Sequence, residues 1–234
     1  MSTALCPALP EAPAEVVAAA LADVAALGGF FTLPLGGPEA GWHSVDDAYA
    51  LGFADRAEAI AERYRTRELR IGASIAQLGH AARLWSPLLA CTLIHGVVPD
   101  LSVLHRADDG PALRLPVPAG WYADRRPHLA AVLYEQVVPR HLAALAAGLR
   151  VKVAPRLLDG NAASALVEAA RTLLAARPDL RGPLTELTTS LLATGRLAGT
   201  GHLTGPDLTF RRRSCCLFYR SPVGTKCGDC ALAG

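Results

Sequence analysis

The carboxyl end of this 234-residue chain carries the sequence Ser214-Cys215-Cys216-Leu217-Phe218-Tyr219-Arg220-Ser221-Pro222-Val223-Gly224-Thr225-Lys226-Cys227-Gly228-Asp229-Cys230. Four of the six cysteines lie here, in the spacing C-C-x10-C-x2-C. Four soft thiolates this close in sequence can form an all-thiolate shell around a metal ion or an iron–sulfur centre. The stretch therefore predicts a metallocentre in a short carboxy-terminal module.

The backbone of this stretch needs two unusual turns if its sulfurs are to meet. Gly228 should let the C-x2-C turn fold tightly, and Pro222 and Gly224 should let the spacer reverse direction. The neighbours Cys215 and Cys216 would point to opposite faces of an extended strand. Both can face one centre only if the backbone between them is distorted.

Spacing alone leaves several kinds of site open. A C-x2-C pair is typical of structural zinc, although zinc sites usually use two separated pairs rather than adjacent cysteines. A disulfide framework suits a secreted chain, and residues Met1 to Pro13 contain no recognisable signal peptide. Simple packing of buried cysteines is the third alternative. Zinc and an iron–sulfur cluster remain the two main interpretations.

The ending R-R-S-C-C-L-F-Y-R-x-x-x-G-x-x-C-G-D-C resembles the carboxy-terminal signature of the FhuF-like ferric-siderophore reductases. Other blocks resemble the family too: Ala73-Ser74, residues 79–87, residues 95–101, Gly160-Asn161 and Ser164-Ala165. The resemblance implies that a [2Fe-2S] cluster is held by Cys215, Cys216, Cys227 and Cys230. It runs from about residue 65 onward, and nothing functional is transferred to residues 1–64.

The resemblance also implies an activity, the one-electron reduction of a ferric siderophore with release of Fe(II) in the cytoplasm. Hard oxygen donors bind Fe(III) much more strongly than Fe(II), so one electron loosens the complex. The partners would be the ferric siderophore and an electron-donor protein or small reductant. The alternatives are a zinc-stabilised helical interaction domain without redox activity and an electron-transfer protein with another target.

Two sets of arginines are candidate docking residues. Arg211, Arg212 and Arg213 directly precede the cysteines, where they would favour the reduced cluster or receive an anionic partner. The alternative is a solvated basic run. Arg83 lies in a family-like block and is either a substrate-facing residue or part of a helix junction.

No other residue set predicts a catalytic site. His80, His95 and His202 are expected to be ordinary hydrogen-bonded or surface histidines, and Cys91 a small buried residue. Cys6 has no cysteine partner nearby in the sequence. Leu217, Phe218 and Tyr219 are expected to shield the centre from water. The sequence contains no Ser-His-Asp arrangement or phosphate-binding loop, so no catalytic residue is assigned.

Composition limits the class of protein. With 51% hydrophobic and 19% charged residues, the chain should fold into a globule. A net charge of +2 gives no reason to expect nucleic acid as a partner. The apolar stretch Leu84 to Val98 is too short for a membrane span, although peripheral membrane contact is compatible with it. We therefore expect a cytoplasmic protein.

Hydrophobic periodicity predicts a mainly α fold with one small β-hairpin. Helices are expected over residues 13–27, 55–85, 86–95, 127–147, 161–176 and 184–197, with strands at 101–105 and 112–115. Ser44 should cap a short helix. Apolar residues at helical spacing in the longest helix predict a buried stripe: Ile71, Ile75, Leu78, Ala82 and Trp85. The expected regions are 1–64, a helical docking body at 65–205, and the cluster module at 206–234.

Overall fold

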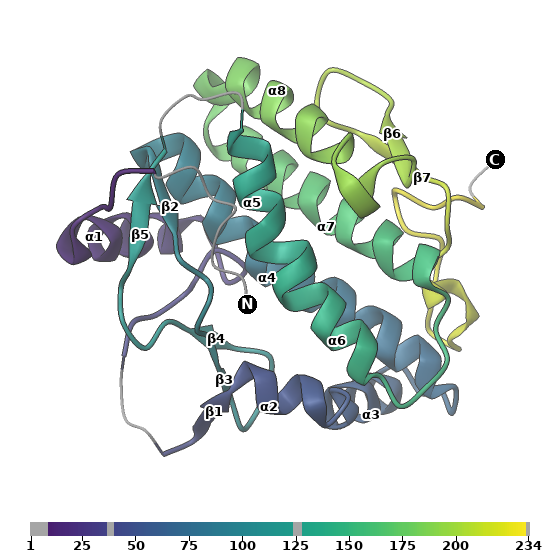
Figure 1. Cartoon of the computed structure of the whole chain (residues 1–234). Coiled ribbons are helices and arrows are strands. Elements are labelled where there is room, and N and C mark those ends of the chain that lie inside the picture. Colours follow the sequence, from purple (N-terminus) through teal and green to yellow (C-terminus); the bar gives the residue numbers. More distant parts are fainter. Residues whose placement is uncertain (1–8, 37–39, 124–127, 233–234) are drawn as a thin grey trace.

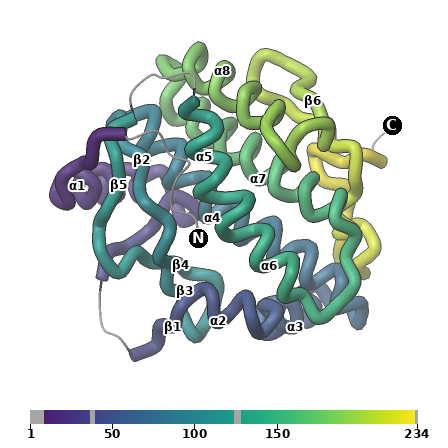
Figure 2. The backbone as a smooth tube through the Cα atoms, viewed as in Figure 1, coloured from purple at the N-terminus to yellow at the C-terminus, as the bar shows by residue number. Residues whose placement is uncertain are grey.

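The computed structural model of this protein describes residues 9–36, 40–123 and 128–232. Helices dominate it, and three small sheets lie around them, so the predicted mainly α fold is confirmed. Helices α4 (Leu69–His95) and α7 (Pro155–Ala176) pack along each other through the middle of the molecule (Figure 1). The carboxy-terminal segment runs along one side of this pair, as the yellow end of the tube in Figure 2 shows.

The remaining helices surround this pair. They are α1 (Ala14–Val24), α2 (Val45–Ala50), α3 (Ala54–Arg63), α5 (Leu129–Val137), α6 (Ala143–Gly148) and α8 (Arg181–Leu192), with short 3-10 turns at Ala25–Leu27, Pro178–Leu180, Gly195–Leu197 and Phe218–Arg220. The backbone N–H of Asp46 donates to the Ser44 hydroxyl at 3.2 Å, which confirms the predicted cap of α2.

The helix expected over 55–85 is two helices, and the break expected at Ser86-Pro87 is absent. Arg65 adopts a left-handed conformation between α3 and α4 (φ 53°), which reverses the chain. A Cβ on Gly72 would lie 2.0 Å from the carbonyl oxygen of Ala57, so this glycine lets the two helices touch. The helix α4 continues through Pro87 because the residues around it are fully buried and packing outweighs the lost hydrogen bond.

The later helices also differ from their predicted limits. A π-helical turn, Val138–Leu142, contains Pro139 and separates α5 from α6, where one continuous helix was expected. A proline lacks the N–H that an α-helix requires, and the wider turn accommodates it. Helix α7 begins at Pro155, so residue 161, where this helix was expected to begin, lies inside it. Residue 127, where the helix over 127–147 was expected to begin, lies outside the described residues.

The strands form three antiparallel sheets. The predicted hairpin is present as β3 (His105–Ala107) and β4 (Leu113–Arg114), shifted toward the turn and extended by β1 (Trp42–Ser44). Two pairs were not predicted: β2 (Val97–Pro99) with β5 (Gly120–Tyr122), and β6 (Gly201–Leu203) with β7 (Phe210–Arg212). Each has at most three residues per strand, too few to show a period-two pattern.

A hydrophobic core extends from Leu9 to Phe210. Trp85, at the centre of α4, is fully buried, and its indole N–H donates to the carbonyl of Ala162 in α7 at 3.2 Å. This contact fixes the two long helices that support the cysteine segment. Among the described helices, none has both the length and the apolar character that a membrane crossing requires.

Candidate metal centre

The hairpin β6–β7 directly precedes the cysteine segment in the chain. The N–H of Arg213 donates to the carbonyl of Thr200 at 2.7 Å, which extends the hairpin by one residue. The N–H of Arg212 donates to the carbonyl of Asp229 at 3.1 Å. This second bond brings the end of the cysteine segment back beside its beginning, so the two cysteine pairs approach each other although ten residues separate them.

The four sulfurs differ in exposure. Cys216 and Cys230 are buried, and Cys215 and Cys227 are half-buried. The Cys227 thiol donates a hydrogen bond to Cys216, which lowers the pKa of Cys216 to about 6 and raises that of Cys227, and the charge of Arg212 favours the Cys216 thiolate further. Burial raises the pKa of Cys215. Among described residues, no three His, Cys, Asp or Glu side chains are grouped so that they could hold one metal ion.

Backbone N–H groups surround the sulfurs. Leu217 donates to the Cys215 sulfur at 3.2 Å, Phe218 donates to Cys216, and Leu232 donates to the Cys230 sulfur at 3.4 Å. Leu217 is left-handed (φ 68°), so the chain turns directly after the adjacent cysteines and not between them. Because N–H donors stabilise negative charge on sulfur, this backbone suits thiolate ligands.

The glycine that the segment needs is Gly224 rather than Gly228. A Cβ on Gly224 would lie 1.8 Å from the carbonyl oxygen of Phe218, whereas a Cβ on Gly228 would meet no atom within 4 Å. The C-x2-C turn closes through the N–H of Cys230, which donates to the Cys227 carbonyl at 3.0 Å. The expected turn is present, but its glycine is not sterically required.

The arginine run does not act as one surface. Side chains alternate along β7 and its continuation, so Arg212 is buried while Arg213 is exposed and Arg211 is half-buried. Arg213 and Arg211 are therefore accessible to a docking partner, whereas Arg212 is not. Arg212 is the buried member of the run, and its guanidinium is hydrogen-bonded to α7.

Buried hydrogen bonds tie Arg212 to both long helices. Its guanidinium donates to the side-chain oxygen of Asn161 in α7, and the Asn161 amide donates to the carbonyl of Ser74 in α4 at 2.9 Å. The Ser74 hydroxyl donates in turn to the carbonyl of Cys216 at 2.8 Å. Ser74 and Asn161 thus hold the cysteine segment, and they lie in two of the family-like blocks for which no function was predicted.

Two buried donors beside the cysteines lack partners. Arg212 Nε and the Ser214 hydroxyl make no hydrogen bond to any described residue, and Arg212 forms no ion pair with a described acid. A buried cation without a counter-ion is costly, so the surroundings of Arg212 require negative charge. Cysteine thiolates would supply it, so the chemistry of the donors fits an iron–sulfur cluster, while the four side chains are not gathered around one point in the described structure.

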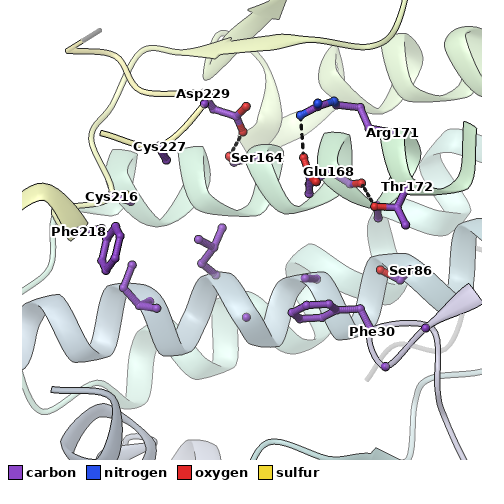
Figure 3. A pocket seen from close by; sticks show the side chains of 18 of the residues that line it. Phe30, Ser86, Ser164, Glu168, Arg171, Thr172, Cys216, Phe218, Cys227 and Asp229 are labelled. Atoms are coloured by element: carbon purple, nitrogen blue, oxygen red, sulfur yellow. Dashed lines mark hydrogen bonds and ion pairs between the residues drawn. The ribbon is translucent and has the colours of Figure 1, made fainter. Parts of the chain in front are cut away.

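A cleft of about 640 Å³ opens beside the cysteines, between α4 and α7. In Figure 3, Cys216, Cys227 and Phe218 lie at one end and Phe30 projects into it farther along. The polar residues of its wall are mostly paired: Ser164 donates to Asp229, and Arg171 contacts Glu168 at 2.9 Å. Most of the remaining wall is apolar. A molecule bound in this cleft would therefore lie beside Cys216 and Cys227.

Residues that the sequence left without a role line this cleft. Gly28, Gly29, Phe30 and Phe31 come from the turn after α1, and Tyr64 stacks edge-on against Phe218 with ring centres 4.9 Å apart. All belong to residues 1–64. Their sequence gives no sign of this position, because a Gly-Gly-Phe-Phe loop is equally compatible with an exposed turn.

The other candidates lie elsewhere. Arg83 is half-buried beside the cleft but not in its wall, and its guanidinium lies over the Phe30 ring at 4.7 Å. His80 contacts the Tyr49 hydroxyl at 2.6 Å, His95 contacts Asp23 at 3.0 Å, and His202 is exposed in β6. Tyr219 is also exposed, so of the three expected shielding residues only Phe218 packs into the cleft. Cys6 lies outside the described residues.

Comparison with known proteins gives one finding at this site. No curated protein and no solved structure matches the chain significantly. Residues 212–232, which begin at the buried arginine and include all four clustered cysteines, match the family model of the FhuF 2Fe-2S C-terminal domain.

Proposed function

We propose that this protein reduces ferric siderophores, or related ferric chelates, by one electron through a [2Fe-2S] cluster. The observation that supports this proposal is the position of Cys216 and Cys227 in the wall of the cleft between α4 and α7. A structural zinc site is closed by its ligands and needs no contact with a bound molecule. A redox centre that passes an electron to a bound molecule must lie near it, and a molecule in this cleft would lie beside Cys216 and Cys227.

The ligands would be Cys215, Cys216, Cys227 and Cys230. All-cysteine ligation gives a cluster of low potential, which suits the reduction of Fe(III) held by hard oxygen donors. When bound, the cluster supplies electrons one at a time. Arg212, the Ser214 hydroxyl and the backbone N–H groups of residues 217, 218 and 232 offset the negative charge of the sulfurs.

The cleft would hold the ferric chelate. Its volume of about 640 Å³ falls within the range of small-molecule sites, and Phe30, Phe31 and Phe218 would exclude water from the contact with the sulfurs. One electron passes to the chelated Fe(III), which becomes Fe(II) and is then held weakly by the same oxygen donors. An electron-donor protein or small reductant restores the lost electron. We place this reaction in the cytoplasm, where thiolates stay reduced.

The experiment is anaerobic stopped-flow absorbance of the purified protein after chemical reduction. Mixing with a ferric hydroxamate or catecholate should restore the oxidised cluster bands while a ferrous-specific chelator captures Fe(II) at the same rate. Cys227→Ser is the control, because it removes a proposed ligand in the cleft wall. Iron, sulfide and zinc analysis identifies the centre. Stoichiometric zinc without iron would establish the structural alternative, and reoxidation without Fe(II) would indicate another electron acceptor.

A further inference from the structure

A second cavity, of about 340 Å³, adjoins the cleft between α3 and α4. Its wall shares Phe30, Tyr64, Ile75 and Gly79 with the cleft, so a molecule in one cavity lies next to the other. We call it the arginine pocket, because three arginines line it: Arg56, Arg63 and Arg83.

The positive charge of the arginine pocket is not neutralised from within. None of its lining residues is acidic. Asp55 is next to Arg56 in the chain; its carboxylate forms its ion pair with Arg106, and its charge offsets that of Arg56 only in part, because burial still lowers the Arg56 pKa. Arg83 donates to the carbonyl of Gly79 in its own helix at 2.9 Å, and no described acid forms an ion pair with any of the three arginines.

Burial makes this arrangement unfavourable without an anion. Arg83 is half-buried, and burial and the nearby charge of Arg56 both lower its pKa. His80, which also lines the pocket, is buried, and its pKa lies well below the ordinary value, so it adds no charge of its own. Two like charges in partly desolvated surroundings repel each other, and an entering anion would relieve that repulsion.

The pocket also presents aromatic surfaces. Phe30, Phe53 and Tyr64 contribute to its wall, and the Arg83 guanidinium lies over the Phe30 ring. Flat rings beside guanidinium groups favour a planar anionic group over a compact hydrated ion. The volume of the pocket suits one arm of a ligand whose body lies in the larger cleft.

We propose that the arginine pocket binds an anionic aromatic arm of the ferric chelate and so selects catecholate-type complexes over neutral hydroxamate complexes. This inference rests on the proposed function for the identity of the ligand. Three hydroxamates neutralise a trivalent ion, whereas three catecholates leave a strongly anionic complex. Arg83 and Arg56 would thus be specificity-determining residues that do not contact the reacting iron.

The test measures binding without electron transfer. Gallium(III) replaces iron because it has the same charge and similar ligand preferences but is not reduced. Quenching of tryptophan fluorescence would give the dissociation constants of gallium(III) tris-catecholate and gallium(III) tris-hydroxamate for the cluster-bearing protein. Arg83→Gln and Arg56→Gln should each weaken tris-catecholate binding by about tenfold, as expected for a lost charge contact, and change tris-hydroxamate binding little.

Two further variants sharpen the test. Arg83→Lys keeps the charge and should retain most of the tris-catecholate affinity, and Arg181→Gln makes the same charge change on α8 outside the pocket and should have no effect. The inference is overturned if both pocket variants bind tris-catecholate like the wild type, or lose both complexes equally. Because gallium cannot be reduced, this result is separate from the proposed function, which fails if no ferric chelate yields Fe(II).

Discussion

The guanidinium of Arg212 and the side-chain amide of Asn161 meet in the buried space between the cysteine segment and α7. Both side chains are almost completely inaccessible to solvent, and the amide is neutral, so it orients the cation without cancelling its charge. The charge of Arg212 also favours the thiolate forms of Cys215, Cys216 and Cys227. The contact with Asn161 therefore holds the positive charge of Arg212 beside these cysteines.

We expect Arg212→Gln to lower the midpoint potential of the cluster. A nearby cation favours the more negative reduced state, so removing it makes reduction harder. The exposed neighbour Arg213→Gln is the matched control and should change the potential less, with an effect that declines as salt is added. Protein-film voltammetry at low and high ionic strength measures both. Equal shifts in the two variants would contradict a special role for the buried arginine.

Replacing any one of Cys215, Cys216, Cys227 and Cys230 by serine should remove or destabilise the cluster. Serine offers a harder, less acidic ligand atom in place of the thiolate. Cys91→Ala is the control, because Cys91 is fully buried in α4 and burial raises its pKa to about 12, so it stays a neutral thiol. Visible absorbance with iron and sulfide analysis gives the result. Retention of a full cluster in a serine variant would remove that cysteine from the ligand set.

Gly160→Ala should impair the seating of the cysteine segment. A Cβ at this position in α7 would lie 2.1 Å from the Ser214 hydroxyl oxygen and 3.3 Å from the Arg212 guanidinium, so the Ser214 side chain must rotate and Arg212 must shift slightly. Gly182→Ala in α8 is the matched control, because its Cβ would meet no atom within 4 Å and alanine favours a helix by about 0.5–1 kcal/mol. The measurement is the fraction of cluster that each variant retains after overnight dialysis. If Gly160→Ala and Gly182→Ala retain the same fraction, the contact of Gly160 with Ser214 does not position the cysteine segment.

Acid should destabilise the fold through His141. This residue is buried between the Tyr49 hydroxyl at 3.1 Å and the carbonyl of Leu101 at 2.8 Å, and burial lowers its pKa from 6.5 to about 4. The unfolded chain therefore binds the proton first, and stability present above pH 6.5 is lost as the pH falls toward 4. The loss should be of the order of 3 kcal/mol at most.

Urea unfolding at pH 7 and pH 4.5 measures this loss. The variant His141→Gln cannot take up the proton, so its free energy of unfolding should change less between the two pH values than that of the wild type. Part of the acid response remains in the variant, because His80 is buried against the same Tyr49 hydroxyl and its pKa is also lowered. An equal loss in both would assign the acid sensitivity to other residues.

Local sequence was sufficient for part of the site. The expected turn at the C-x2-C pair is present, closed by the N–H of Cys230 on the Cys227 carbonyl. The stripe Ile71, Ile75, Leu78, Ala82 and Trp85 was also a correct helical pattern. Its ends are buried, but Ile75, Leu78 and Ala82 line the cleft. Periodicity marks an apolar face without showing whether a core or a cavity covers it.

The sequence by itself determined the mainly helical fold and the gathering of four thiols in one short segment, because helical periodicity and cysteine spacing are local properties of the chain. Tertiary structure alone decided which arginine is buried, which residues form the cleft, and how α3 folds back on α4. Those outcomes depend on contacts between distant segments, such as Arg212 with Asn161 and Tyr64 with Phe218. No local pattern encodes them, since each partner is compatible with an exposed position in its own segment.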